Sequence, residues 1–170
     1  MPGKQDVLDL LERLEIPFDL MEHEAVMTVA ESALIRRNFP GMLCKCLFLK
    51  DRDGYWLLAI PAALRVDLKK LAASLGGKRL SFASREELQA LLGLSPGAVS
   101  LLGVVNDSGG KVRVLLDNAV ACSESPLLFH PMVNTATVRL GANELIRFLE
   151  YVKHNPAILS VPDSEENDDA

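Results

Sequence analysis

The sequence is poor in cysteine and aromatic residues, and it contains no long uncharged apolar run. Its three cysteines, Cys44, Cys46 and Cys122, are odd in number and unlike a disulfide framework, which predicts reduced thiols in a cytoplasmic protein. No run of about 18 apolar residues is present, and the N-terminus lacks a signal-peptide pattern, so we expect no membrane contact. With one Trp, two Tyr and six Phe, base-stacking platforms are not expected either.

Motifs of several catalytic classes are also missing. The sequence has no glycine-rich nucleotide-binding motif, no H-E-x-x-H zinc motif and no G-x-S-x-G nucleophile motif. Cys44 and Cys46 stand at a C-x-C spacing without the second pair of ligands that a zinc knuckle usually needs. We therefore expect neither a metal nor a cofactor.

The negative charge is concentrated at one end. The net charge is −5, and residues 161–170 carry five of the 23 acidic residues, which leaves 18 acidic against 18 basic residues in the rest. We expect one domain over residues 1–158 and an acidic, disordered tail over residues 159–170. The acidic balance of the chain therefore does not argue against a polyanionic partner for the domain.

Apolar periodicity and turn residues predict an α+β domain with a mixed, mostly antiparallel sheet and surrounding helices. Capping boxes and glycines mark several helix ends, and the polar turn at residues 51–54 predicts a β-hairpin. Residues 98–105 and 112–116 are expected to pair as antiparallel strands around the turn at 106–110. The predicted helices cover residues 5–14, 28–37, 67–74, 84–93 and 142–153, and the predicted strands cover 16–21, 43–50, 55–61, 98–105, 112–116, 127–130 and 135–140.

Lys45 is the first residue that the fold does not explain. It lies in the most apolar strand, on the face that alternation also gives to Leu43, Leu47 and Leu49. Two interpretations stay open: an edge strand whose lysine extends to water, or a lysine that lines a pocket and binds an anion or polar ligand.

Two loops have the composition of ligand-binding segments. Residues 93–103 carry glycines at 93, 97 and 103, and such a loop can expose backbone N–H groups, although it can also be an ordinary turn. His130 and Asn134 bracket a tight turn between predicted strands, where a histidine is more often structural than catalytic. His23 and His154 are expected at the surface.

Residues 65–85 form a basic stretch with six cations and one acid. A solvated helix face explains many such runs, and a surface that contacts phosphates is the alternative. The six cations are Arg65, Lys69, Lys70, Lys78, Arg79 and Arg85.

Four segments together resemble one known family. Residues 23–31 are similar to its H-x-x-x-x-T-x-x-E segment and residues 44–51 to its C-K-N-L-F-L-K-D strand. Residues 94–107 resemble its glycine-rich loop and strand, and residues 129–137 its F-H-P-x-x-N-x-x-T turn. The family is the YbaK/ProX group of aminoacyl-tRNA deacylases, and the free-standing ProX type, which hydrolyses Ala-tRNA(Pro), is the most similar branch.

This resemblance implies a barrel-like sheet and hydrolysis of an aminoacyl ester at the acceptor end of tRNA(Pro), with prolyl-tRNA synthetase as a second expected partner. It implies that Lys45 and His130 are catalytic. The implied substrate-binding residues are Cys46, Gly97, Ala98, Val99, Ser100, Leu101, Met132 and Asn134, with Leu47, Val99 and Met132 as expected wall residues. The basic stretch supplies the expected tRNA-binding residues, which are Arg65, Lys69, Lys70, Lys78 and Arg79.

The chain departs from the family pattern at two positions, where Cys46 replaces asparagine and Leu101 replaces proline. A thiol is a poor substitute for an amide in hydrogen bonding, and leucine does not stiffen a loop as proline does. Two other functions therefore remain in view: a deacylase for another mischarged tRNA, such as Ser- or Cys-tRNA, and a non-catalytic module that binds tRNA or a synthetase.

Overall fold

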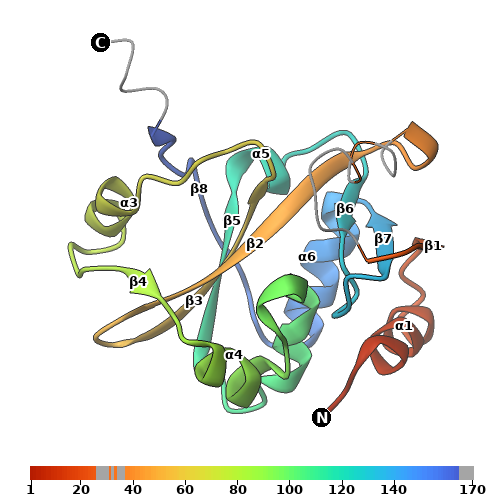
Figure 1. Ribbon diagram of the computed structural model, residues 1–170, viewed down its shortest axis with the longest axis horizontal. Coiled ribbons are helices and arrows are strands. Elements are labelled where there is room, and N and C mark those ends of the chain that lie inside the picture. The colour runs from red at the N-terminus through yellow and green to blue at the C-terminus, as the bar shows by residue number, and fades with distance from the viewer. Residues whose placement is uncertain (26–30, 32, 34–36, 165–170) are drawn as a thin grey trace.

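The computed structural model describes residues 1–25, 31, 33 and 37–164 of the chain, and in this part an eight-stranded mixed sheet organises the domain (Figure 1). The strand order is β1-β7-β6-β2-β3-β5-β8, with β4 paired to β2 beside this path. The strands are β1 (Asp19–Glu22), β2 (Met42–Asp51), β3 (Gly54–Pro61), β4 (Ser81–Phe82), β5 (Val112–Asp117), β6 (Leu127–Phe129), β7 (Ala136–Leu140) and β8 (Ala157–Leu159).

Helices cover both faces of this sheet. The helix α3 lies at the opposite end of the molecule from α1 and β1 (Figure 1). The helical elements are α1 (Lys4–Arg13), α3 (Leu68–Ser74), α4 (Arg85–Leu92), α5 (Asn118–Ala121), α6 (Ala142–Tyr151) and the 3₁₀ turns η1 (Pro96–Ala98) and η2 (Leu101–Asn106). Within the described residues, no helix is long and apolar enough to cross a membrane.

Local sequence signals explain many of the element ends. The predicted hairpin is confirmed: β2 and β3 pair antiparallel from Cys44 with Pro61 to Asp51 with Gly54. Asp67 caps α3 by accepting from the N–H of Lys70, and Ser84 caps α4 in a capping box with Glu87. The predicted helix over residues 28–37 lies largely outside the described residues.

The prediction was wrong for residues 98–105, which form 3₁₀ turns instead of a strand. A Cβ on Gly103 would lie 2.7 Å from Cδ1 of Leu94, so the glycine allows a close packing contact that this turn requires. The strand β5 consequently has no antiparallel partner before it and pairs parallel with β3.

The sheet is mixed, with more antiparallel than parallel pairs, as expected, but it is not closed into the expected barrel-like form. It is open, because β1 and β8 stand at the two ends of the strand order. The pairs β2–β6, β3–β5 and β5–β8 are parallel, while the other four described pairs are antiparallel. The long connection from β3 to β5, which contains α3 and α4, accommodates the parallel crossover.

Alternation along β2 and β3 separates two apolar cores. Leu49, Leu58 and Ile60 pack on the face covered by α3. Cys44, Phe48, Leu57 and Ala59 pack on the opposite face, against α1, α4, η2 and α6. This alternation places Lys45, opposite Ile60 in the hairpin, on the α3 face and Cys46 on the other.

A buried ion pair joins the end of η2 to the segment after α6. His154 Nε2 lies 2.9 Å from Oδ2 of Asp107, and the two side chains are 4% and 2% exposed. The carboxylate of Asp107 also accepts from the N–H groups of Lys111 and Val112, and His154 Nδ1 lies 2.7 Å from the Val152 carbonyl. The expectation of a surface position for His154 was wrong, because its ring is buried against Asp107. Through Asp107, the histidine connects the segment after α6 to the end of η2 and the start of β5.

The packed part of the chain extends beyond residue 158, where we placed the start of the tail. Val161 is buried, and its N–H donates to Oδ1 of Asp117 at 2.8 Å. Asp163 forms a β-bridge with Val66, and the N–H of Ser164 donates to the Arg65 carbonyl. The acidic character of the terminal residues therefore does not prevent packing as far as Ser164.

Candidate functional site

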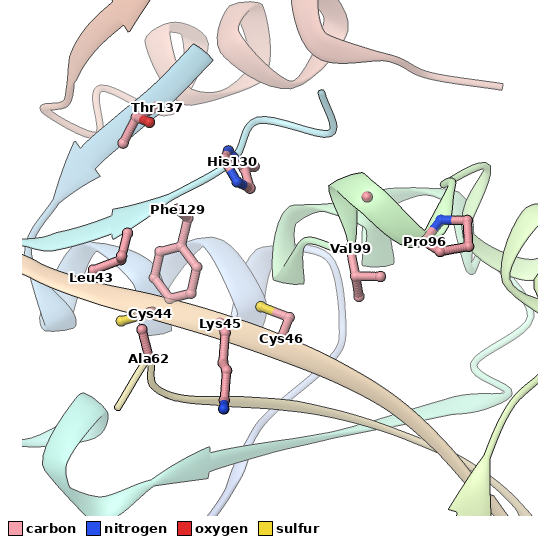
Figure 2. A pocket seen from close by; sticks show the side chains of 11 residues that line it. Leu43, Cys44, Lys45, Cys46, Ala62, Pro96, Val99, Phe129, His130 and Thr137 are labelled. Atoms are coloured by element: carbon pink, nitrogen blue, oxygen red, sulfur yellow. The ribbon is translucent and has the colours of Figure 1, made fainter. Parts of the chain in front are cut away.

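A gap in the sheet creates the cavity that we regard as the candidate active site. Along one edge of β2, β6 pairs with Met42 and Leu43, and β4 pairs with Leu49 and Lys50. In the described part of the chain, residues 44–47 have no strand partner on that edge. A cavity of about 260 Å³ opens beside them, and it is lined by Leu43, Cys44, Lys45, Cys46, Ala62, Pro96, Gly97, Val99, Phe129, His130 and Thr137 (Figure 2).

Lys45 and His130 line this cavity from different sides of β2. Figure 2 shows the Lys45 side chain leaving the strand on the side opposite to the Cys46 thiol, while His130 and Val99 lie on the Cys46 side. No hydrogen bond or ion pair joins the Lys45 ammonium to another described residue. Lys45 is therefore placed to bind an anion at the rim of the cavity rather than inside it.

The hydrogen bonds of His130 set its tautomer. Nδ1 lies 3.0 Å from the Ala136 carbonyl, and since a carbonyl only accepts, Nδ1 carries a proton. In the neutral ring, Nε2 is then an acceptor. The Ser100 hydroxyl donates to the His130 carbonyl and accepts from the N–H of Leu102. The glycine-rich loop and the histidine turn are thus held together by a serine that is fully buried.

The turn after His130 contains a residue in an unfavourable backbone conformation. Met132 has a φ of +69° and is 8% exposed. A non-glycine residue in the left-handed region costs about 1 kcal/mol or more and persists where the surrounding packing fixes it. The buried Met132 side chain therefore helps to fix this turn, although it does not line the cavity.

Thr137 is a polar cavity residue that we did not predict. Its hydroxyl lies 2.8 Å from His23 Nε2, and His23 Nδ1 lies 2.7 Å from the Glu24 carbonyl. Because His23 must donate through Nδ1, a neutral ring accepts the Thr137 proton at Nε2. The threonine oxygen then keeps lone pairs for a donor in the cavity. A hydroxyl on a strand with otherwise apolar buried residues was the signal that could have identified it.

The structure brings together only part of the predicted substrate site. Lys45, Cys46, Gly97, Val99 and His130 line the cavity. The remaining predicted residues do not: Ala98, Ser100, Leu101 and Met132 are buried, and Asn134 approaches Gly97 from outside the lining. The expected wall residue Leu47 lines a neighbouring cavity instead.

The loop offers fewer free backbone donors than its sequence suggests. The N–H of Ala98 donates to the Ser95 carbonyl, which leaves Gly97 and Val99 as the cavity-lining members of this loop. The Leu101 backbone lies near enough to the Cys46 thiol to lower its pKa slightly against the larger effect of burial. The two positions that depart from the family pattern are therefore neighbours.

The two strand cysteines are poor nucleophiles, although Cys46 is only half-buried at the cavity wall, whereas Cys44 is buried. Burial raises the pKa of Cys46 to about 12 and raises the pKa of Cys44 as well. A thiol with a pKa near 12 is ionised in roughly one molecule in ten thousand at pH 8. Neither thiol is therefore suited to act as a nucleophile at neutral pH.

We expect iodoacetamide at pH 8 to modify Cys122, which is exposed, and to leave Cys44 and Cys46 unmodified. Peptide mass spectrometry after timed alkylation measures this directly. Carbamidomethylation of Cys46 at the rate of Cys122 would contradict the raised pKa, and alkylation of all three after unfolding in urea is the control.

The predicted basic surface is only partly available to a ligand. Arg65, Lys69, Lys70 and Arg79 are exposed around α3. Lys78 forms an ion pair with Asp53, and Arg65 and Lys70 also have partners within the domain. Lys69 and Arg79 line a shallow groove of about 400 Å³ beside α3. Lys45 lies on the same sheet face as α3, so these cations and Lys45 face one side of the molecule.

The matches to known proteins agree with this geometry. The family model described as an aminoacyl-tRNA editing domain matches residues 23–148. The chain is 36% identical over 152 residues to the prolyl-tRNA editing protein ProX of Acetoanaerobium sticklandii, covering 88% of this chain and 92% of that protein. It is 32% identical over 155 residues to the prolyl-tRNA synthetase associated domain-containing protein 1 of Bos taurus, covering 88% of this chain and 90% of that protein.

Solved structures show the same fold. The crystal structure of a proposed trans-editing enzyme for prolyl-tRNA synthetase superposes with a TM-score of 0.76 at 20% identity, covering 96% of this chain and 99% of that one. Together with the family model, which spans most of the chain, these similarities establish that the protein belongs to the aminoacyl-tRNA editing domain family.

Proposed function

We propose that the protein is a trans-editing deacylase that hydrolyses alanine from mischarged tRNA(Pro). The observation that carries this proposal is the small cavity at the β2 gap, with His130 inside and, at its rim, Lys45, a cation that no described residue pairs with. The similarity to a prolyl-tRNA editing protein supports tRNA(Pro) as the tRNA that carries the ester. The activity breaks the ester between the alanine carbonyl carbon and the ribose oxygen by addition of water.

The cavity offers partners for each part of an alanine ester. Thr137 presents an oxygen that can accept from the α-ammonium group, and Val99 and Phe129 supply apolar contacts for the methyl group. The N–H groups of Gly97 and Val99 are the candidate donors for the oxyanion that develops on the carbonyl. His130 Nε2 is the acceptor for a proton of the attacking water or of the neighbouring ribose hydroxyl.

Lys45 takes the role of an anchor for the tRNA backbone. Its ammonium lies outside the cavity, on the face that also carries α3, so a terminal phosphate bound there leaves the aminoacyl ester at the cavity mouth. The basic residues around α3 are then the contact surface for the acceptor stem. Prolyl-tRNA synthetase is the proposed source of the mischarged tRNA and a second partner.

Size selection follows from this cavity. Alanine is smaller than proline, so a synthetase built for proline cannot exclude it by size, whereas a second, smaller hydrolytic site can accept alanine and reject proline. The fixed loop and turn around Ser100 keep this cavity small.

Incubation with tRNA(Pro) charged separately with Ala, Ser, Cys and Pro tests the proposal. We expect the alanyl ester to be hydrolysed at least about tenfold faster than the prolyl ester. A tenfold difference in rate requires only about 1.4 kcal/mol of difference in transition-state free energy. Faster release of serine or cysteine would assign another substrate to the same fold. Binding of tRNA without any release would show a non-catalytic module.

A further inference from the structure

A second cavity adjoins the first across the glycine-rich loop. It has a volume of about 210 Å³ and lies between β2, β4, the start of α4 and η1. Cys46, Pro96 and Val99 line both cavities. The two cavities are therefore neighbours, and a ligand that fills the first can extend along the shared wall toward the second.

Phe82 forms an exposed wall of the second cavity. It lies on β4 opposite Leu49 and is 59% exposed, although it is a large apolar side chain. Exposed phenylalanine rings lose the stabilisation that burial would supply, so the position does not serve the core. A flat aromatic ring beside a small apolar cavity suits a planar ligand, because rings stack face to face or offset.

Arg85 lines the same cavity and is also unexplained by the fold. It is the first residue of α4, where the helix dipole is positive, so a cation at this position destabilises the helix slightly. Its side chain is exposed and has no hydrogen-bonding or ionic partner in the part of the chain that the structure describes, so it can meet an anionic ligand. The second cavity thus combines an apolar floor, an exposed ring and a positive charge.

We propose that the second cavity binds the adenine base of the terminal nucleotide of the substrate, stacked on Phe82. This inference rests on the proposed function, in which alanine occupies the first cavity. The ester oxygen belongs to the ribose that also carries the base, so acyl group and base must occupy neighbouring sites. That ribose would lie against the shared wall, which is formed by Cys46, Pro96 and Val99.

The charges fit the same arrangement. Phe82 pairs with Leu49, whose face of the sheet also carries Lys45, and the second cavity lies at the β2 edge, where Leu47 of that face and Cys46 of the other face both line it. A phosphate on Lys45, a base on Phe82 and an acyl group beside His130 then surround one nucleoside. Arg85 adds attraction for the preceding phosphates.

The test compares two alanylated RNAs that differ only at the terminal ribose, which carries adenine in one and no base in the other. We expect the wild-type protein to hydrolyse the adenine form about tenfold more efficiently, the size of one base–aromatic stack. Phe82→Leu should remove this preference and leave hydrolysis of the abasic form unchanged. Phe82→Trp should restore the preference.

Tyr151→Leu is the matched control, because Tyr151 is 54% exposed on α6, which lines neither cavity. Equal wild-type rates on the two RNAs would overturn the adenine site while leaving the proposed function intact. Equally slowed hydrolysis of both RNAs by Phe82→Leu, with an unchanged melting temperature, would also overturn the adenine site. Hydrolysis of neither RNA by the wild type would instead refute the proposed function.

Discussion

Replacing Lys45 with alanine is expected to lower kcat/KM for Ala-tRNA(Pro) about 100-fold without loss of stability. The ammonium has no hydrogen-bonding or ionic partner among the described residues, so its removal breaks no hydrogen bond or ion pair in that part of the chain. A charge-assisted hydrogen bond to a phosphate contributes about 1.5 to 3 kcal/mol, and 100-fold corresponds to about 2.7 kcal/mol. The measurements are single-turnover hydrolysis and a thermal melt of the same preparation.

Lys111→Ala is the matched control, because Lys111 is exposed and lines neither cavity. It should keep wild-type hydrolysis. Lys45→Arg retains the charge, but the guanidinium has a different shape and reach, so its kcat/KM should lie between those of the wild type and Lys45→Ala. Wild-type hydrolysis by Lys45→Ala would remove Lys45 from the mechanism.

Replacing Asp107 with alanine is expected to destabilise the domain by about 3 to 5 kcal/mol, the usual cost of breaking a buried ion pair by removing one partner. The change leaves His154 without its carboxylate and the N–H groups of Lys111 and Val112 without their acceptor. For a chain of this length the melting temperature should fall by roughly 10 °C.

Asp107→Asn keeps one side-chain oxygen for the backbone donors, so its melting temperature should lie between those of the wild type and Asp107→Ala. The control Glu86→Ala removes an exposed carboxylate from α4 and should change the melting temperature little. A melt of Asp107→Ala within 2 °C of wild type, roughly the effect of a surface change, would show that the pair contributes nothing to stability.

Local chemistry explains which parts of the fold the sequence predicts. The hairpin turn at Asp51 and the caps at Asp67 and Ser84 depend on neighbouring residues, so their prediction was correct. The run at residues 98–105 is apolar at nearly every position, and such a run has no period that separates a strand from a buried turn. Its contact with Leu94 decided the outcome, and that contact exists only in the folded chain.

In the candidate site, too, some features could be predicted from the sequence and others depend on contacts that exist only in the folded chain. Lys45 was singled out because a cation in an apolar strand contradicts its surroundings, whereas the catalytic role expected of His130 came from the family resemblance, and both residues line the cavity. Ser100 and Met132 were predicted as substrate contacts, but their side chains fix the loop and the turn from behind. Phe82 was not singled out, because the scarcity of aromatic residues argues against an extended stacking platform but does not exclude one ring that serves one base.

The pairing of β1 with β7 has a consequence for how the chain folds. Asp19 lies opposite Arg139, 120 positions later, and an ion pair at 2.9 Å joins their side chains. A strand whose partner is so distant must wait until nearly the whole polypeptide is synthesised. Topologies dominated by such non-local contacts fold slowly, in milliseconds to seconds rather than microseconds. Newly made chains therefore leave β1 unpaired until β7 forms, and an unpaired strand edge is exposed to aggregation and proteolysis during this interval.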